Sequence, residues 1–126
     1  MSAEQKTVVV GVTGGIAAYK TCELVRALVK RGYRVKVVMT EAATRFVSPL
    51  TFRTLSAEPV TVSMWVDEQD AKVHHISLAE EADVMVIAPC TANVIAKLVH
   101  GRADDMLTTT ALATEAPLVI APAMNV

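Results

Sequence analysis

Residues 7–39 read TVVVGVTGGIAAYKTCELVRALVKRGYRVKVVM, in which two apolar runs are joined by a glycine turn and an amphipathic segment. The runs at 7–12 and 35–39 are rich in valine, which is typical of strands that are buried on both faces of a sheet. Between them, apolar residues recur at helical spacing over 16–31, and Gly32 is placed to end that helix. These residues therefore predict a βαβ unit with parallel strands and a right-handed crossover.

The rest of the chain repeats this alternation of strand and helix. Two further apolar runs, at 84–88 and 118–121, also predict buried strands, and 60–64 predicts a shorter one. Helices are expected at 41–47, 49–55, 75–82, 92–100 and 104–114, with a solvated loop at 65–72. In the helix at 16–31 the residues expected to face the core are Ala18, Cys22, Val25, Leu28 and Val29. The predicted fold is α/β, a Rossmann-like doubly wound parallel sheet in three αβα layers, within a single domain over 1–126.

Composition limits the classes of function. The 126 residues are 52% hydrophobic, enough for one core, and 12 Lys+Arg against 13 Asp+Glu give a formal net charge of −1. The charges are spread along the chain and form no basic stripe, so we expect no binding to nucleic acid or to an anionic membrane. No apolar stretch reaches the roughly 20 residues of a membrane span, and the polar start of the chain resembles no secretion signal, so we expect a cytoplasmic protein. Cys22 and Cys90 form no CxxC pair, so we expect reduced thiols and no metal site.

Three predicted strands each end in a small, polar turn. These turns lie at 13–16, 89–93 and 122–125. Because the carboxyl ends of parallel strands meet at one edge of the sheet, the three turns are expected to form one composite crevice.

The first turn has the composition of a phosphate site. Gly14, Gly15 and Ile16 lead into a helix whose free N–H groups and dipole favour an anion. The glycines do not match GxGxxG, and the second strand ends at Thr40 rather than at an acidic residue, so a mononucleotide fits better than a dinucleotide. Taken alone, the turn is also compatible with glycines that serve only for packing.

The other polar residues near this edge allow more than one interpretation. Thr91 and Asn93 can hydrogen-bond a ligand or simply cap a helix. His74 and His75 can do acid–base work near neutral pH, although histidines in a surface loop are usually inert. Asn125 can bind a carboxylate or finish a turn.

Six motifs occur in a specific order along the chain: VTGGIAAYK, MTEAATRF, HHISL, APCTANVIAK, GRADD and APAMN. In order and spacing they resemble the flavin-dependent cysteine decarboxylase family, most closely its bacterial branch that acts on 4'-phosphopantothenoylcysteine. That branch is commonly the N-terminal half of a bifunctional coenzyme A biosynthesis protein, fused to a synthetase domain. The resemblance implies FMN as cofactor, 4'-phosphopantetheine as product, and a homotrimer with the site near the subunit interface.

The resemblance also implies roles for individual residues. His75, which immediately precedes Ile-x-Leu, matches the family's catalytic histidine, and Asn125 matches the asparagine that binds the substrate carboxylate. The FMN-binding positions implied are Gly14, Gly15, Ile16, Thr40, Thr91, Ala92, Asn93, Val94 and Ala123. In this chemistry the flavin oxidises the cysteine CH2–SH to a thioaldehyde, which makes loss of CO2 possible.

One departure from the family pattern bears on turnover. A Met-Trp pair and a flap cysteine that follow the PAMN motif in the family lie beyond Val126, and neither Cys22 nor Cys90 occupies that motif. As it stands, the domain is thus expected to be truncated, to bind flavin and to lack full turnover. A peptidyl-cysteine decarboxylase of lantibiotic type and a non-catalytic FMN-binding regulatory protein are the alternatives, and flavin prenyltransferases rank third.

Overall fold

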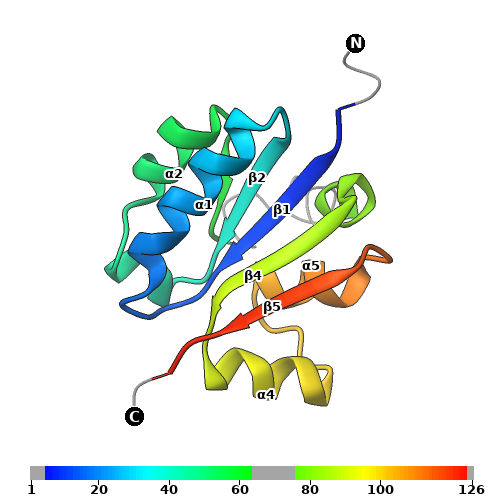
Figure 1. Cartoon of the computed structure of the whole chain (residues 1–126). Helices are drawn as coiled ribbons and strands as arrows, with labels where there is room; N and C mark the ends of the chain where they lie inside the picture. Colours follow the sequence, from blue (N-terminus) through cyan, green and yellow to red (C-terminus); the bar gives the residue numbers. More distant parts are fainter. Residues whose placement is uncertain (1–4, 64–75, 125–126) are drawn as a thin grey trace.

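The computed structural model describes residues 5–63 and 76–124. Five parallel strands form one sheet in the order β3-β2-β1-β4-β5, with β1 at its centre (Figure 1). The strands are β1 (Thr7–Val12), β2 (Arg34–Met39), β3 (Val60–Thr61), β4 (Val84–Cys90) and β5 (Leu118–Pro122). The predicted parallel α/β sheet is confirmed.

Helices cover both faces of this sheet. They are α1 (Ala18–Lys30), the 3₁₀ helix η2 (Ala42–Arg45), α2 (Pro49–Ser56), α4 (Ala92–His100) and α5 (Met106–Ala113), and residues 76–81 are also helical. In Figure 1, α1 and α2 lie on one side of the sheet, whereas α4 and α5 lie on the other. The predicted three-layer αβα arrangement is therefore confirmed.

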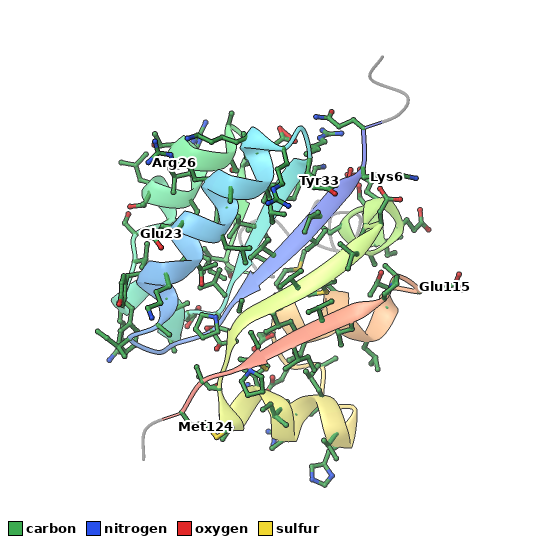
Figure 2. All side chains as sticks on the ribbon, viewed as in Figure 1. Lys6, Glu23, Arg26, Tyr33, Glu115 and Met124 are labelled. Carbon is green, nitrogen blue, oxygen red and sulfur yellow. The ribbon has the colours of Figure 1, made fainter. Side chains whose placement is uncertain are left out.

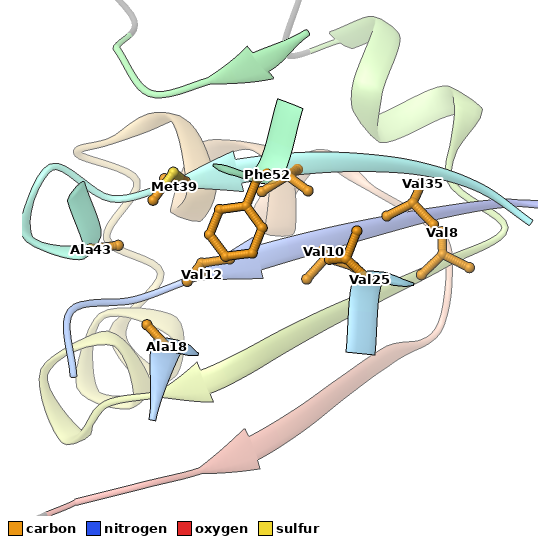
Figure 3. Packing of buried hydrophobic residues seen from close by; sticks show 10 residues of the cluster. Val8, Val10, Val12, Ala18, Val25, Val35, Met39, Ala43 and Phe52 are labelled. Carbon is orange, nitrogen blue, oxygen red and sulfur yellow. The ribbon is translucent and has the colours of Figure 1, made fainter. Parts of the chain in front are cut away.

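The two cores follow from the alternation of side chains along β1. Val8 and Val10 point toward α1 and α2, where they pack in one cluster with Val25 and Phe52 (Figure 3). Val9 points the opposite way and belongs to a second cluster that includes residues of β4, α4 and α5. Because β1 is buried along its whole length, its sequence contains no polar residue after Thr7.

The solvent-facing side of α1 is charged, as its periodicity predicts. Glu23 and Arg26 are exposed and point away from the sheet (Figure 2). Val29, in the last turn of α1, was expected in the core and is instead 36% exposed, whereas Leu28 beside it packs against the core. Thr21 was not among the residues expected in the core, but it is buried and donates a hydrogen bond to the carbonyl oxygen of Ala88 at 2.7 Å.

Strand β5 corrects a second expectation. Its apolar run predicted burial on both faces, yet every residue of β5 is exposed. Within the described residues β5 pairs only with β4 and forms the edge of the sheet. The register of that pairing shifts between Ile87 and Cys90, a segment that contains the cis Ala88-Pro89 peptide bond.

The predicted helix boundaries are mostly confirmed. Ser48 caps α2 by accepting a hydrogen bond from Leu50 N, and Gly32 and Gly101 have the positive φ expected of residues that end helices. Helix α1 begins at Ala18, two residues later than predicted, since the glycine turn continues through Ala17.

Two other elements differ in length or type from the prediction. The segment 41–47 is a 3₁₀ helix over Ala42–Arg45, and β3 is shorter than the 60–64 predicted. The loop expected at 65–72 lies outside the described residues. Among the helices that are described, none has the length and apolar character needed to cross a membrane.

Phe52 tests the core between α2 and the sheet, because it is fully buried. Phe52→Ala is expected to lower the free energy of unfolding by about 3–5 kcal/mol, from lost burial and the cavity left behind. Arg53→Ala, at the next and exposed position of α2, is expected to change it by less than about 0.5 kcal/mol. Urea unfolding of the two variants measures both values, and equal effects would contradict this packing.

Candidate functional site

The three predicted turns lie together at the carboxyl edge of the sheet. They contribute to two cavities of about 520 and 530 Å³ that share Gly14, Thr91 and Asn93. We call the first the glycine cavity; it is lined by Gly14, Gly15, Ile16, Ala17, Phe46, Thr91, Ala92, Asn93, Ala123 and Met124. The second, the aspartate cavity, lies beside Thr40 and contains Asp104 and Asp105. Both volumes fall in the range of small-molecule sites.

Helix α1 begins without a side-chain cap. Ser48, Thr91 and Asp105 cap α2, α4 and α5, whereas α1 has Ala17 at the corresponding position and no cap hydrogen bond. Within the described residues, the N–H groups of Gly14, Gly15 and Ile16 have no protein acceptor. The first turn of α1 also contains no acidic residue. Free N–H groups and an unopposed helix dipole together suit an anion.

Gly14 lies where only glycine fits. A Cβ built on Gly14 would lie 2.6 Å from the Cβ of Ala42 and 3.0 Å from its backbone carbon. At Gly15 the nearest atom to an added Cβ is Thr91 Cγ2, at 3.9 Å. Gly14 therefore allows the first turn to pack against η2, while Gly15 is sterically open.

The start of α4 combines a satisfied cap with free polar groups. Thr91 Oγ1 accepts from Val94 N at 3.3 Å, which confirms the capping interpretation of Thr91. Asn93, by contrast, is exposed in the first turn and faces both cavities. Its side-chain amide is thus available to donate to a ligand or to accept from it.

A charged group forms one wall of the aspartate cavity. Lys97 Nζ lies 3.0 Å from Asp104 Oδ1 and 3.5 Å from Asp105 Oδ2, and Arg102 Nε lies 3.3 Å from Asp104 Oδ2. The hydrogen bond from Lys97 lowers the pKa of Asp104. These ion pairs hold the segment between α4 and α5 against the cavity.

The two cysteines do not behave as reactive thiols. Cys22 is half-buried, Cys90 is buried, and neither is in a disulfide. Burial raises the pKa of each thiol, which keeps both protonated near neutral pH. In the part of the chain that the structure describes, no cluster of His, Cys, Asp and Glu could hold a metal ion.

All nine predicted FMN-binding positions line one or both cavities, although this geometry does not assign their role. Thr40 and Val94 lie only in the aspartate cavity, and the others reach the glycine cavity. His75 and Asn125 lie outside the described residues. The helical segment 76–81 that follows His75 is attached to the fold by buried Leu78 and Ala79 and by the ion pair of Glu81 with Lys36, at 2.5 Å.

Sequence reasoning assigned no role to several residues that line these cavities. Phe46 and Met124 are exposed at the rim of the glycine cavity, and Met124 follows β5 (Figure 2). Lys97 lies four residues after Asn93, so both are on one face of α4. The four-residue spacing of Asn93 and Lys97, together with the GRADD segment that follows, could have identified the charged wall formed by Lys97, Asp104 and Asp105.

Gly14 and Gly15 provide a matched test of the first turn. Gly14→Ala is expected to lower the free energy of unfolding by about 1–3 kcal/mol, because backbone atoms of Ala42 must move. Gly15→Ala is expected to change it by less than about 1 kcal/mol, since the added methyl meets ordinary contacts. Thermal unfolding of both apo variants gives the comparison, and a larger loss in Gly15→Ala would disprove this geometry.

Glu81 tests how the segment after His75 is held. Hydrogen bonds from Lys36 and Ser77 lower the pKa of Glu81, so this carboxylate stabilises the fold above its unfolded pKa of about 4.3 and loses that effect as the pH falls through its folded value. Glu81→Gln is expected to cost up to about 1 kcal/mol at pH 7, because the pair is partly exposed, and less below about pH 4. Denaturant unfolding at several pH values measures this, with exposed Glu80→Gln as control; a cost independent of pH would exclude the ion pair as its cause.

Comparison with known proteins extends the sequence resemblance. A family model described as Flavoprotein matches residues 1–126. The coenzyme A biosynthesis bifunctional protein CoaBC of Bacillus subtilis is 54% identical over 121 residues, 96% of this chain, and that of Vibrio cholerae is 50% identical over 120 residues, 95% of the chain. The chain spans 30% of the length of each of these relatives.

Solved structures share the fold. The FMN-dependent cysteine decarboxylase TvaF matches with a TM-score of 0.87 and 27% identity, over 96% of this chain and 75% of its own. A PPC decarboxylase, solved as a cysteine-to-serine mutant with pantothenoylaminoethenethiol, matches with a TM-score of 0.81 and 31% identity, over 97% and 69% respectively. From its sequence, its parallel sheet and these matches, the chain belongs to the Flavoprotein family.

Proposed function

We propose that this chain is the FMN-binding decarboxylase domain of a protein that converts 4'-phosphopantothenoylcysteine to 4'-phosphopantetheine in coenzyme A biosynthesis. The observation that carries the proposal is the uncapped, acid-free start of α1, which opens into a cavity shared with the start of α4. Such a site suits the phosphate of a mononucleotide. The family match and the CoaBC relatives supply the rest of the support.

The residues present fit FMN. Gly14, Gly15 and Ile16 would hold the phosphate through free N–H groups. The other predicted contacts would line the ribityl chain and ring: Thr40, Thr91, Ala92, Asn93, Val94 and Ala123. The two cavities share the lining residues Gly14, Thr91 and Asn93, so an elongated ligand could extend from one to the other across these residues.

When bound, FMN would supply the two-electron oxidation of the cysteine CH2–SH group, which places a C=S bond beta to the carboxylate and allows CO2 to leave, and the reduced flavin would then return a hydride to the resulting enethiol to give 4'-phosphopantetheine. His75 assists proton transfer at the cysteine, because imidazole exchanges protons near neutral pH. Asn125 donates its amide N–H to the substrate carboxylate and orients it. Both roles come from the motifs that contain these residues.

The pantothenoyl substrate is favoured over a peptide. Identity to the bifunctional coenzyme A proteins reaches 54%, compared with 27% to TvaF and 35% to SpaF, which are both named as FMN-dependent cysteine decarboxylases. The match to a PPC decarboxylase solved with pantothenoylaminoethenethiol supports the same choice. A peptide that ends in cysteine is the second candidate substrate, because TvaF, the structural match with a TM-score of 0.87, comes from thioviridamide biosynthesis.

The assembly and the complete protein are part of the proposal. A homotrimer with the site near the subunit interface would cover the apolar side chains exposed around the glycine cavity, among them Ile16, Phe46 and Met124. A synthetase domain in the complete protein agrees with the bifunctional name of the relatives. Sedimentation equilibrium should give the mass of three chains, and a monomer at micromolar concentration would exclude the trimer.

The activity is tested by anaerobic addition of 4'-phosphopantothenoylcysteine to the FMN-loaded protein. The flavin absorbance is expected to bleach and CO2 to be released, whereas His75→Asn should retain flavin and not bleach. A peptide ending in cysteine, added in parallel, should react at least about tenfold more slowly, because the pantothenoyl contacts are missing.

Other outcomes would point elsewhere. Failure of the assembled protein to bind FMN would reject the proposal as a whole. Flavin that binds and never bleaches would favour a non-catalytic binding protein, and faster reaction with the peptide would favour the second substrate.

A further inference from the structure

Thr13 is a buried residue that neither the family match nor the sequence motifs explain. It lies between the end of β1 and Gly14, is 0% exposed, and lines neither cavity. Its hydroxyl donates to the carbonyl oxygen of Pro89 at 2.6 Å and accepts from the N–H of Thr91 at 3.1 Å. Its own N–H also donates to Pro89 O, at 3.3 Å. A single threonine thus joins the first turn to the second across 76 residues of sequence.

Two other hydrogen bonds reach the same end of β4. Thr21, on the first turns of α1, donates to Ala88 O at 2.7 Å, and Ala123 N donates to Cys90 O at 3.1 Å. The backbone at 88–91 is therefore hydrogen-bonded to three other segments. Ala88 O accepts from α1, Pro89 O and Thr91 N bond to the first turn, and Cys90 O accepts from the third turn. Among these hydrogen bonds, the one from Thr13 to Pro89 O is buried, whereas the one from Thr21 is partly buried. Of the two side chains, only that of Thr13 both donates and accepts.

The Thr13 hydroxyl also hydrogen-bonds the N-cap residue of α4, and Thr13 lies next to the glycine turn that leads into α1. Thr91 N–H is held by Thr13, and Thr91 Oγ1 in turn caps α4. On the other side, Thr13 is bonded directly to Gly14, which lines both cavities and whose N–H has no acceptor among the described residues. The pairing of β1 with β4 brings the glycine turn and the start of α4 together, and the Thr13 side chain adds a direct hydrogen-bonded link between them.

We propose that Thr13 is a positioning residue for the FMN site, which holds the glycine turn and the start of α4 at the separation that the cofactor requires. This inference rests on the proposed function, because it takes FMN as the ligand that bridges the two turns. Thr13 does not touch the ligand. It acts through the backbone groups of Gly14 and Thr91, so its loss should weaken binding without removing any direct contact.

Replacement of Thr13 by valine removes the hydroxyl and keeps the volume. Pro89 O then loses its shorter hydrogen-bond partner, and the partly buried N–H of Thr91 loses the acceptor that Thr13 provided. Thr13→Val is expected to raise the Kd for FMN about tenfold or more, because the two turns are no longer held at the separation that the cofactor requires. Thr13→Ser keeps both hydrogen bonds and is expected to remain within about threefold of the wild type.

The control for a general loss of stability is Thr110→Val. Thr110 is also 0% exposed and also donates a buried hydrogen bond, to Met106 O at 2.7 Å, but it lies on α5 and lines neither cavity. Thr110→Val is expected to lower the melting temperature and to leave the FMN Kd unchanged.

The experiment titrates FMN into the complete, assembled protein and follows quenching of flavin fluorescence, together with the visible circular dichroism of bound flavin. In Thr13→Val that spectrum should change shape, because the two turns no longer hold the cofactor in one orientation. Wild-type affinity in Thr13→Val, or an equal loss in Thr110→Val, would overturn the proposal. So would a loss in Thr13→Ser as large as in Thr13→Val, and this comparison holds even where the valine variant folds poorly.

If the wild-type protein fails to bind FMN, the proposed function fails. If the wild type binds and the valine variant binds equally well, only the role of Thr13 is wrong. The two failures are therefore distinguishable in one titration series.

Discussion

The parallel pairing of β1 with β4 is the constraint on which the rest of the structure depends. Val8 to Gly11 pair with Val84 to Ile87, so both strands end at the same level of the sheet. Helices on both faces exclude water from β1, which leaves its hydrogen-bonding groups no partners except neighbouring strands. Once this register is set, the turns that leave β1 and β4 must lie side by side. The candidate site is the consequence of that proximity.

The two helix starts at this edge are built differently, and the difference has a physical meaning. At α4 the Thr91 hydroxyl satisfies one of the free N–H groups, and Asn93 adds an adaptable amide. At α1 no side chain does so, and the glycines leave the backbone bare. A bare helix start is costly unless an anion or water pairs with it, whereas a capped start is stable alone. On the proposed function, the start of α1 would therefore bind the phosphate, and the capped start of α4 would contribute the Asn93 amide.

The elements of the fold were largely predictable from local pattern. Valine runs, helical periodicity and glycine stops located β1, α1 and α4 to within two residues. Burial was less predictable where it depends on neighbours: the LVIA run of β5 has the composition of a central strand and lies at an edge. In the same way, Val29 has the helical period of the buried residues and is 36% exposed in the last turn of α1. Periodicity reports which side a residue faces, but not what lies there.

The site shows the same division between local and long-range information. The glycine turn and the TAN segment could be found because their composition is unusual on its own. Thr13 belongs to that turn, but its role could not be predicted, because its partners at Pro89 and Thr91 are 76 and 78 residues away. In a site made mainly of backbone groups, the lining residues contact the ligand, and other residues hold the backbone in place. The second kind is recognised only when the fold brings distant hydrogen-bonding groups together.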